Sequence, residues 1–260
     1  MENYERYIPR EYLALKINYC RKQLSELPVI KVYNHTANGE SKNRLIVGSH
    51  RYEFGTAMWQ KYQNIMLMRQ NIEQRLKIYD SIWDYNFRFP PLSECKPDKV
   101  NRTLFNSNNE PVLLDKAFFD SLKNDSNDIY AKNKNYYFNG TYYRSASERD
   151  IAILYTQMGI PFKYEPEISL AGLFKPVHTD FVLYIKEIDN CKFHEHFGIK
   201  DSADYQRITK IKYGNYSGAG LLPGIDILYT HDTDEAPFDI RSVISVLNSA
   251  IYGTILTNKS

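Results

Sequence analysis

The sequence predicts an α+β or α/β protein in which an N-terminal helical hairpin with a small β element precedes a compact unit of helix, three strands, helix, strand and helix. Apolar residues have helical spacing near the N-terminus, and helix-like and strand-like patterns alternate after residue 143. The chain has 260 residues, of which 43% are hydrophobic and 25% charged, which is typical of one large or two small globular domains. We expect a helical segment at 1–88, a connector at 89–135 and a core at 136–260.

The N-terminal segment is expected to contain two amphipathic helices joined by a β-hairpin. Apolar residues recur at steps of three and four in 11–27 and again in 58–85, which places them on one helical face. Pro28 ends the first helix. Residues 29–47 alternate loosely around Asn38-Gly39, a dipeptide typical of a tight hairpin turn. Two such helices normally pack together, and their basic residues form either a solvated face or a DNA contact.

The connector is the least regular part of the chain. Prolines and an Asn-rich run at 106–109 interrupt it, and 113–122 has the pattern of a short helix. The core then opens with a predicted hairpin at 136–143 that has Asn139-Gly140 at its tip. The predicted helices of the core span 145–159, 201–215 and 239–251, and its predicted strands span 161–170, 178–185, 192–197 and 225–230.

Composition narrows the classes of function. The 33 Lys and Arg nearly balance the 31 Asp and Glu, so bulk charge requires neither a nucleic-acid nor a membrane partner. Cys20, Cys95 and Cys191 are widely spaced, which favours reduced thiols in a cytoplasmic protein over a disulfide framework or a zinc site. No apolar run approaches a membrane span and the N-terminus is polar, so we expect no membrane partner.

Two carboxylates lie where a metal-dependent hydrolase needs them. Asp180 begins one apolar strand and Glu195 lies in the next. If these strands are neighbours, both side chains can converge on one hard divalent cation such as Mg²⁺, which prefers oxygen ligands. Such a cation would orient the attacking water and offset charge on a phosphate. The alternative is a pair of solvent-facing acids at strand ends.

Glu148 is a third candidate acid with two explanations. It ends the sequence Ser145-Ala146-Ser147-Glu148, which is a capping box for the following helix. It also shares the helical face of Ile151, and an acid on an apolar face indicates a functional site.

Lys212 is the candidate cation. It shares a helical face with Tyr205 and Tyr216, from which it could stabilise a phosphate; the alternative, which the pattern by itself favours, is a surface lysine beside Lys210. Next to Glu195, His196 could bind a metal or accept a proton. In a regular strand, however, His196 faces away from Glu195, which favours a structural role.

The excess of tyrosine, 22 residues, also suits a nucleic-acid surface, because phenol rings can stack on bases. Six tyrosines fall in or beside the proposed site: Tyr142, Tyr143, Tyr155, Tyr164, Tyr205 and Tyr216.

The run 144–232 resembles the PD-(D/E)XK nuclease superfamily, more narrowly its bacterial and phage branch with an SE-x-x-IA helix and an EHFG-type strand. The matching motifs are Ser147-Glu148-Arg149-Asp150-Ile151-Ala152, Gly159-Ile160-Pro161-Phe162, Tyr164-Glu165, Thr179-Asp180-Phe181, Glu195-His196-Phe197-Gly198, Tyr205, Lys212-Tyr213-Gly214-Asn215-Tyr216 and Ile227-Leu228-Tyr229-Thr230. Their order and spacing together carry the resemblance, which covers about a third of the chain.

The resemblance implies a restriction-endonuclease-like core in which Asp180 and Glu195 bind Mg²⁺ or Mn²⁺ and Glu148 helps to place the metal or its water. Two positions depart from the family pattern. Thr179 replaces the proline of the PD dipeptide, and Phe197 occupies the place of the E-x-K lysine. Some members of the superfamily carry this lysine on the following helix, which makes Lys212 the natural substitute.

The leading hypothesis is therefore a metal-dependent endonuclease that hydrolyses phosphodiester bonds, with DNA as its partner and with the N-terminal helices as a grip or a homodimer interface. One alternative is a catalytically inactive nucleic-acid-binding module of the same fold. Another is a phage or mobile-element factor that binds a host protein.

Overall fold

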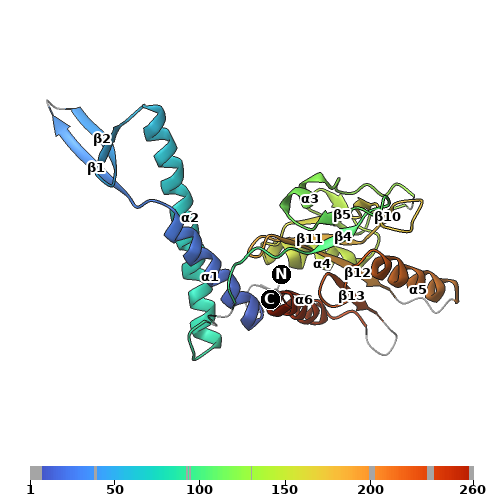
Figure 1. Cartoon of the computed structure of the whole chain (residues 1–260). Coiled ribbons are helices and arrows are strands. Elements are labelled where there is room, and N and C mark those ends of the chain that lie inside the picture. Colours follow the sequence, from blue (N-terminus) through green and yellow to red (C-terminus); the bar gives the residue numbers. More distant parts are fainter. Residues whose placement is uncertain are drawn as a thin grey trace. The chain divides into compact units, whose positions relative to one another are not determined.

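The computed structural model describes residues 8–37, 40–91, 93, 95–129, 131–198, 203–232 and 237–257, and its class is α+β. The chain forms two compact units (Figure 1). The helical unit comprises Leu13–Pro97, and the sheet unit comprises the chain from Asp98 onward together with the residues up to Tyr12. The structure thus divides the chain at other points than the boundaries expected at 88 and 135.

The helical unit contains the two predicted helices and the predicted hairpin. Arg69 joins the helices, because its Nη1 donates to the carbonyl oxygens of Leu24 and Leu27 at 3.0 Å each. A third strand continues the hairpin and was not predicted, whereas the expected turn at Asn38-Gly39 lies outside the described residues. The elements are α1 (Arg10–Glu26), β1 (Ile30–Ala37), β2 (Glu40–Val47), β3 (His50–Glu53) and α2 (Ala57–Asn86).

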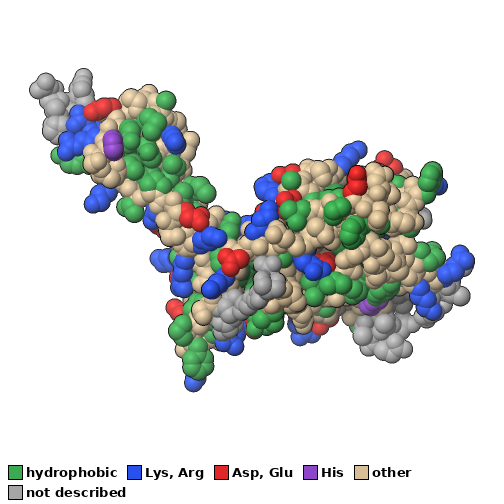
Figure 2. Space-filling model, viewed as in Figure 1, with side chains coloured by type: hydrophobic (Ala, Val, Ile, Leu, Met, Phe, Trp, Pro, Cys, Tyr) green, Lys and Arg blue, Asp and Glu red, His purple; other side chains and the backbone are tan. Residues whose placement is uncertain are grey.

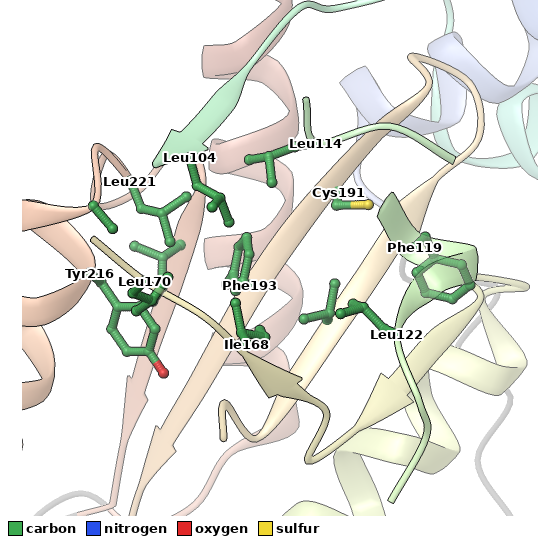
Figure 3. Packing of buried hydrophobic residues seen from close by; sticks show 13 residues of the cluster. Leu104, Leu114, Phe119, Leu122, Ile168, Leu170, Cys191, Phe193, Tyr216 and Leu221 are labelled. Atoms are coloured by element: carbon green, nitrogen blue, oxygen red, sulfur yellow. The ribbon is translucent and has the colours of Figure 1, made fainter. Parts of the chain in front are cut away.

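The segment expected to be a connector contributes to the core of the sheet unit. It contains β4 (Thr103–Phe105), β5 (Pro111–Leu113) and α3 (Lys116–Ser121). The helix is shorter than predicted because β5 takes the first residues and the Asp115 side chain caps α3 by accepting from the backbone N of Phe118. Four buried side chains of this segment pack in the main cluster shown in Figure 3: Leu104, Leu114, Phe119 and Leu122.

The central sheet of this unit has four strands in the order β13-β12-β11-β8. Strand β11 pairs antiparallel with both β8 and β12, and β13 pairs parallel with β12. Counting only the strands of this sheet, the elements follow the predicted order of helix, three strands, helix, strand and helix. The elements are α4 (Ala146–Gln157), β8 (Phe162–Tyr164), β11 (Phe181–Ile185), β12 (Asn190–Phe197), α5 (Ala203–Gly218), β13 (Ile227–His231) and α6 (Ile240–Thr257).

Two of the predicted strands are interrupted. Strand β8 ends at Tyr164 because Glu165 has a φ of 42°, in the left-handed region, and a proline follows it. The two predicted strands also contribute to β9 (Glu167–Ile168) and β10 (Val177–His178), which lie outside β8 and β11 and form a separate two-stranded ladder. Asp180 therefore lies in a gap between β10 and β11 rather than inside a strand.

The hairpin predicted before the core is present as β6 (Tyr137–Phe138) and β7 (Thr141–Tyr142). Asn139 and Gly140 at its tip have φ values of 47° and 86°. Positive φ at both central residues is what a type I′ turn requires, so this part of the prediction is confirmed.

Strand β12 separates two layers of side chains. Cys191 and Phe193 face the cluster of Figure 3, which includes Tyr216 of α5. The alternate residues face the other helices: Lys192 donates to Thr254 of α6 at 2.7 Å, and His194 contacts Tyr155 of α4. Helices α4 and α6 thus pack on one face of the sheet, and α5 packs on the other.

Two further observations bear on the expected class of protein. Among the described residues, only α6 is long and apolar enough to span a membrane, and seven of its eighteen residues are buried inside the protein. All three cysteines are buried, and none of them forms a disulfide bond within the part of the chain that the structure describes.

Candidate functional site

Glu195 is the most deeply buried acid of the candidate site. It lies near the end of β12 and is fully buried. Lys212 Nζ lies 2.6 Å from its Oε2, and the Tyr216 hydroxyl donates to its Oε1. Lys212 and Tyr216 are one helical turn apart on α5, which explains why both reach the same carboxylate. Burial raises the pKa of Glu195 to about 7, with a further rise from the Asp180 charge and an opposing effect of Lys212.

Asp180 lies at the centre of a group of acids. The backbone N of His196 donates to its Oδ2 at 2.7 Å, which ties it to β12 beside Glu195. The Asp180 charge raises the pKa of Glu148, Glu165 and Glu195, in each case after a larger contribution from burial. Carboxylates from α4, from the end of β8 and from β12 are therefore close enough to Asp180 to interact with it electrostatically.

Glu148 fulfils both roles that the sequence left open. Its backbone N donates to Ser145 Oγ at 3.1 Å, as in a helix cap. Its carboxylate interacts with the Ser145 side chain at the cap, and it also accepts from the Tyr164 hydroxyl at 2.6 Å and from the backbone N of Arg144 at 3.2 Å. The helix thus presents this acid toward β8 and Asp180.

Glu165 is a fourth acid to which sequence reasoning gave no role. Its side chain is 3% exposed, and its Oε1 lies 2.7 Å from Arg144 Nη2. Burial raises its pKa to about 7. Lys132 is also near, because the charges of Glu165 and Glu148 both act on its pKa, which burial lowers. The sequence feature that could have pointed to Glu165 is the dipeptide Glu165-Pro166, which directly follows a predicted strand.

The two histidines beside Glu195 face the opposite side of the sheet. His194 Nδ1 lies 2.7 Å from the Tyr155 hydroxyl, and its Nε2 lies 2.8 Å from Thr230 Oγ1. His196 Nδ1 contacts the same Thr230 oxygen at 2.8 Å, and its Nε2 lies 3.3 Å from Asp232. Burial lowers the pKa of His194 to about 3. His196 therefore contributes its backbone N to the site and not its ring.

The residue at the position of the expected E-x-K lysine is Phe197, whose ring belongs to an aromatic cluster. Phe197 stacks on Tyr213, Tyr229 and His231 at centroid distances of 5.6, 5.9 and 5.0 Å. Lys212 Nζ lies 6.0 Å from the centroid of the Phe197 ring. The cation that pairs with Glu195 therefore comes from α5, the helix on which the sequence analysis placed Lys212.

The tyrosines around the site are mostly buried and do not form a stacking surface. Tyr205 belongs to α5, but its side chain lies outside the described part of the chain. Tyr142 is exposed on the hairpin. The other four are buried, because they pack in the core or bind the site's acids: Tyr143, Tyr155, Tyr164 and Tyr216.

The acids fit a metal ion in their chemistry, but their present geometry does not form a coordination shell. Among the described residues, no group of three or more His, Cys, Asp or Glu is gathered closely enough to hold a metal. Each of Glu148, Asp180 and Glu195 instead accepts hydrogen bonds from protein donors. Carboxylate oxygens are nevertheless the preferred ligands of Mg²⁺, and a cation would offset the mutual repulsion of these acids.

Comparison with known proteins identifies no relative. No family model, curated protein or solved structure matches the chain. The class that the structure defines is an α+β protein with a group of carboxylates and a lysine at one end of the two central strands of a mixed sheet.

Proposed function

We propose that the sheet unit is a metal-dependent endonuclease of the PD-(D/E)XK type that hydrolyses phosphodiester bonds in DNA. The observation that carries this proposal is the convergence of an aspartate before β11, a glutamate in β12 and a lysine from α5. Lys212 lies 2.6 Å from Glu195, while Asp180 is bound to the backbone of the next residue, His196. The element order from α4 to α6 agrees with the core that the sequence resemblance implies.

In this proposal Asp180 and Glu195 hold Mg²⁺ or Mn²⁺, and Glu148 helps to place the cation or its water. The bound cation would supply an activated water and neutralise charge on the scissile phosphate. Tyr216 fixes the orientation of Glu195 through its hydrogen bond. Lys212 lies within reach of the same carboxylate and stabilises the negative charge that develops on the phosphate.

The direct test is cleavage of plasmid DNA and of single-stranded DNA with Mg²⁺ or Mn²⁺. We expect cleavage by the wild type and none by the Asp180→Ala, Glu195→Ala double variant. Glu167→Ala serves as a control, because this acid is exposed and belongs to β9. Equal activity of the wild type and the double variant would refute the enzymatic function.

Lys212 has a matched control on its own helix. Lys212→Ala should lower the cleavage rate by about 10²-fold or more, since removal of one group that stabilises transition-state charge has effects of that order. Lys210→Ala removes an exposed lysine two residues away and should leave the rate unchanged. A similar loss in both variants would show that α5 contributes only general positive charge.

One observation favours a second function, a catalytically inactive nucleic-acid-binding module. The acids already have protein donors, and Phe197 stands in place of a lysine. Such a module would bind DNA with a strong dependence on salt and show no metal-dependent turnover. Filter binding across a salt series, together with the cleavage assay, separates the two functions.

A further inference from the structure

Glu165 occupies an unfavourable position for a glutamate. It follows the last residue of β8, its φ is 42°, and its side chain is 3% exposed. Left-handed backbone is uncommon for a residue with a side chain, and a buried carboxylate is costly unless it is fully paired. A glycine would suit this backbone better and would bury no charge.

Three contacts connect Glu165 to two acids of the site. Its backbone N donates to the carbonyl oxygen of Asp180 at 3.0 Å. Its carboxylate oxygen Oε1 forms an ion pair with Arg144 at 2.7 Å, and the backbone N of Arg144 donates to Glu148 Oε2 at 3.2 Å. A short path of contacts therefore runs from the acid before β11, through Glu165, to the acid on α4.

General stabilisation of the fold does not explain this arrangement well. The Oε2 atom of Glu165 is buried and has no hydrogen-bond partner among the described residues. The charges of Glu148 and Asp180 also repel it. Buried polar atoms in folded proteins are usually satisfied, so an exception beside a candidate site calls for a functional explanation.

We propose that Glu165 is a positioning residue of the carboxylate site. Through Arg144 it holds Glu148 at a fixed place relative to Asp180, so that the two acids act together on one divalent cation. The ion pair with Arg144 sets the direction from which the Arg144 backbone N reaches Glu148. This inference rests on the proposed function, because it assumes that the acids bind such a cation.

The test measures Mn²⁺ binding by isothermal titration calorimetry without nucleic acid, and plasmid cleavage in parallel. We expect Glu165→Ala and Glu165→Gly to weaken Mn²⁺ binding by roughly 10- to 100-fold, which is the usual effect of losing a residue that orients metal ligands. The glycine variant tolerates the left-handed backbone, so its loss of binding cannot be attributed to strain. Glu167→Ala, two residues along the chain and exposed, should bind like the wild type.

The Glu165→Gln variant distinguishes a positioning role of Glu165 from direct binding of the cation and from a requirement for its negative charge. Glutamine keeps an oxygen that can accept from Arg144, so it should restore Mn²⁺ affinity to within about threefold of the wild type. A glutamine variant as weak as the alanine variant would overturn the positioning role. Wild-type binding by Glu165→Ala and Glu165→Gly would also overturn it and leave the nuclease proposal intact, whereas a wild type that neither binds Mn²⁺ nor cleaves DNA would overturn both.

Discussion

Helices α2 and α6 differ sharply in how much of their surface is buried. Helix α2 has thirty residues, among which Ile72 and Trp83 are buried, whereas α6 has eighteen residues and seven buried ones. Apolar side chains lie on the visible surface of the helical unit in Figure 2. Four apolar residues of α2 are exposed: Met58, Leu67, Met68 and Ile78. Apolar spacing therefore identifies a helix, but it does not show whether the rest of the chain covers the apolar face.

The largest expected difference between the two units concerns ion pairs. In the sheet unit, Arg102 Nε donates to Asp226 at 2.9 Å, and Asp226 is completely buried. Arg102→Met leaves that carboxylate without its guanidinium partner and should lower the free energy of unfolding by about 3–5 kcal/mol. In the helical unit, Arg21→Met removes an exposed pair with Asp80 and should cost at most about 1 kcal/mol. Urea denaturation followed by circular dichroism measures both, and equal costs would contradict the comparison.

A second pair of variants compares the two helices directly. Leu247 of α6 is 0% exposed and Leu67 of α2 is 48% exposed. Leu247→Ala should lower the free energy of unfolding by about 2–5 kcal/mol, because it leaves a cavity. Leu67→Ala should change it by no more than about 0.5 kcal/mol. A large cost for Leu67→Ala in the same denaturation experiment would show that another surface covers this part of α2.

Lys192 makes the stability of the sheet unit depend on pH. Burial lowers its pKa from 10.5 to about 7. Between these two values the unfolded chain binds more protons than the folded one, so the stability that depends on Lys192 rises with pH across this range. Below pH 7 the lysine is protonated in both states, and the cost of burying its charge is present in full.

Lys192→Met should therefore raise the melting temperature most at pH 6, and this gain should shrink as the pH approaches 10. Loss of the hydrogen bond to Thr254 offsets about 1 kcal/mol of the gain at every pH. Lys175→Met, at an exposed lysine, is the control and should show no such trend. A gain for Lys192→Met that does not vary with pH would contradict a low folded-state pKa.

The smallest expected effect on folding comes from the exposed face of α2. Leu67 and Ile78 are both 48% exposed and lie eleven residues apart, which places them on one side of the helix. If this face forms a homodimer interface, one of the two roles that the sequence analysis gave to the N-terminal helices, the Leu67→Glu, Ile78→Glu variant should be monomeric in analytical ultracentrifugation and retain its melting temperature to within a few degrees. A wild type that is monomeric at the same concentrations would rule out that role.

The sequence placed two residues of the site together where they lie close to each other in the chain. Lys212 and Tyr216 could be placed together because they are one turn apart, and both do bind Glu195. Glu165 was missed because its left-handed φ and its ion pair with Arg144, twenty-one positions earlier, leave no local pattern. The same limit applies to 103–122, where the strands are only three residues long and are separated by asparagines, so no periodic pattern marks the residues that pack in the core.

The Thr230 hydroxyl, which contacts both His194 and His196, has only one proton to donate. With one proton on each ring, a single orientation satisfies every contact. Tyr155 donates to His194, His194 to Thr230, Thr230 to His196, and His196 to Asp232. The carboxylate of Asp232, which can only accept, thus fixes the tautomers of two rings and the direction of a buried chain of hydrogen bonds that begins at Tyr155 of α4.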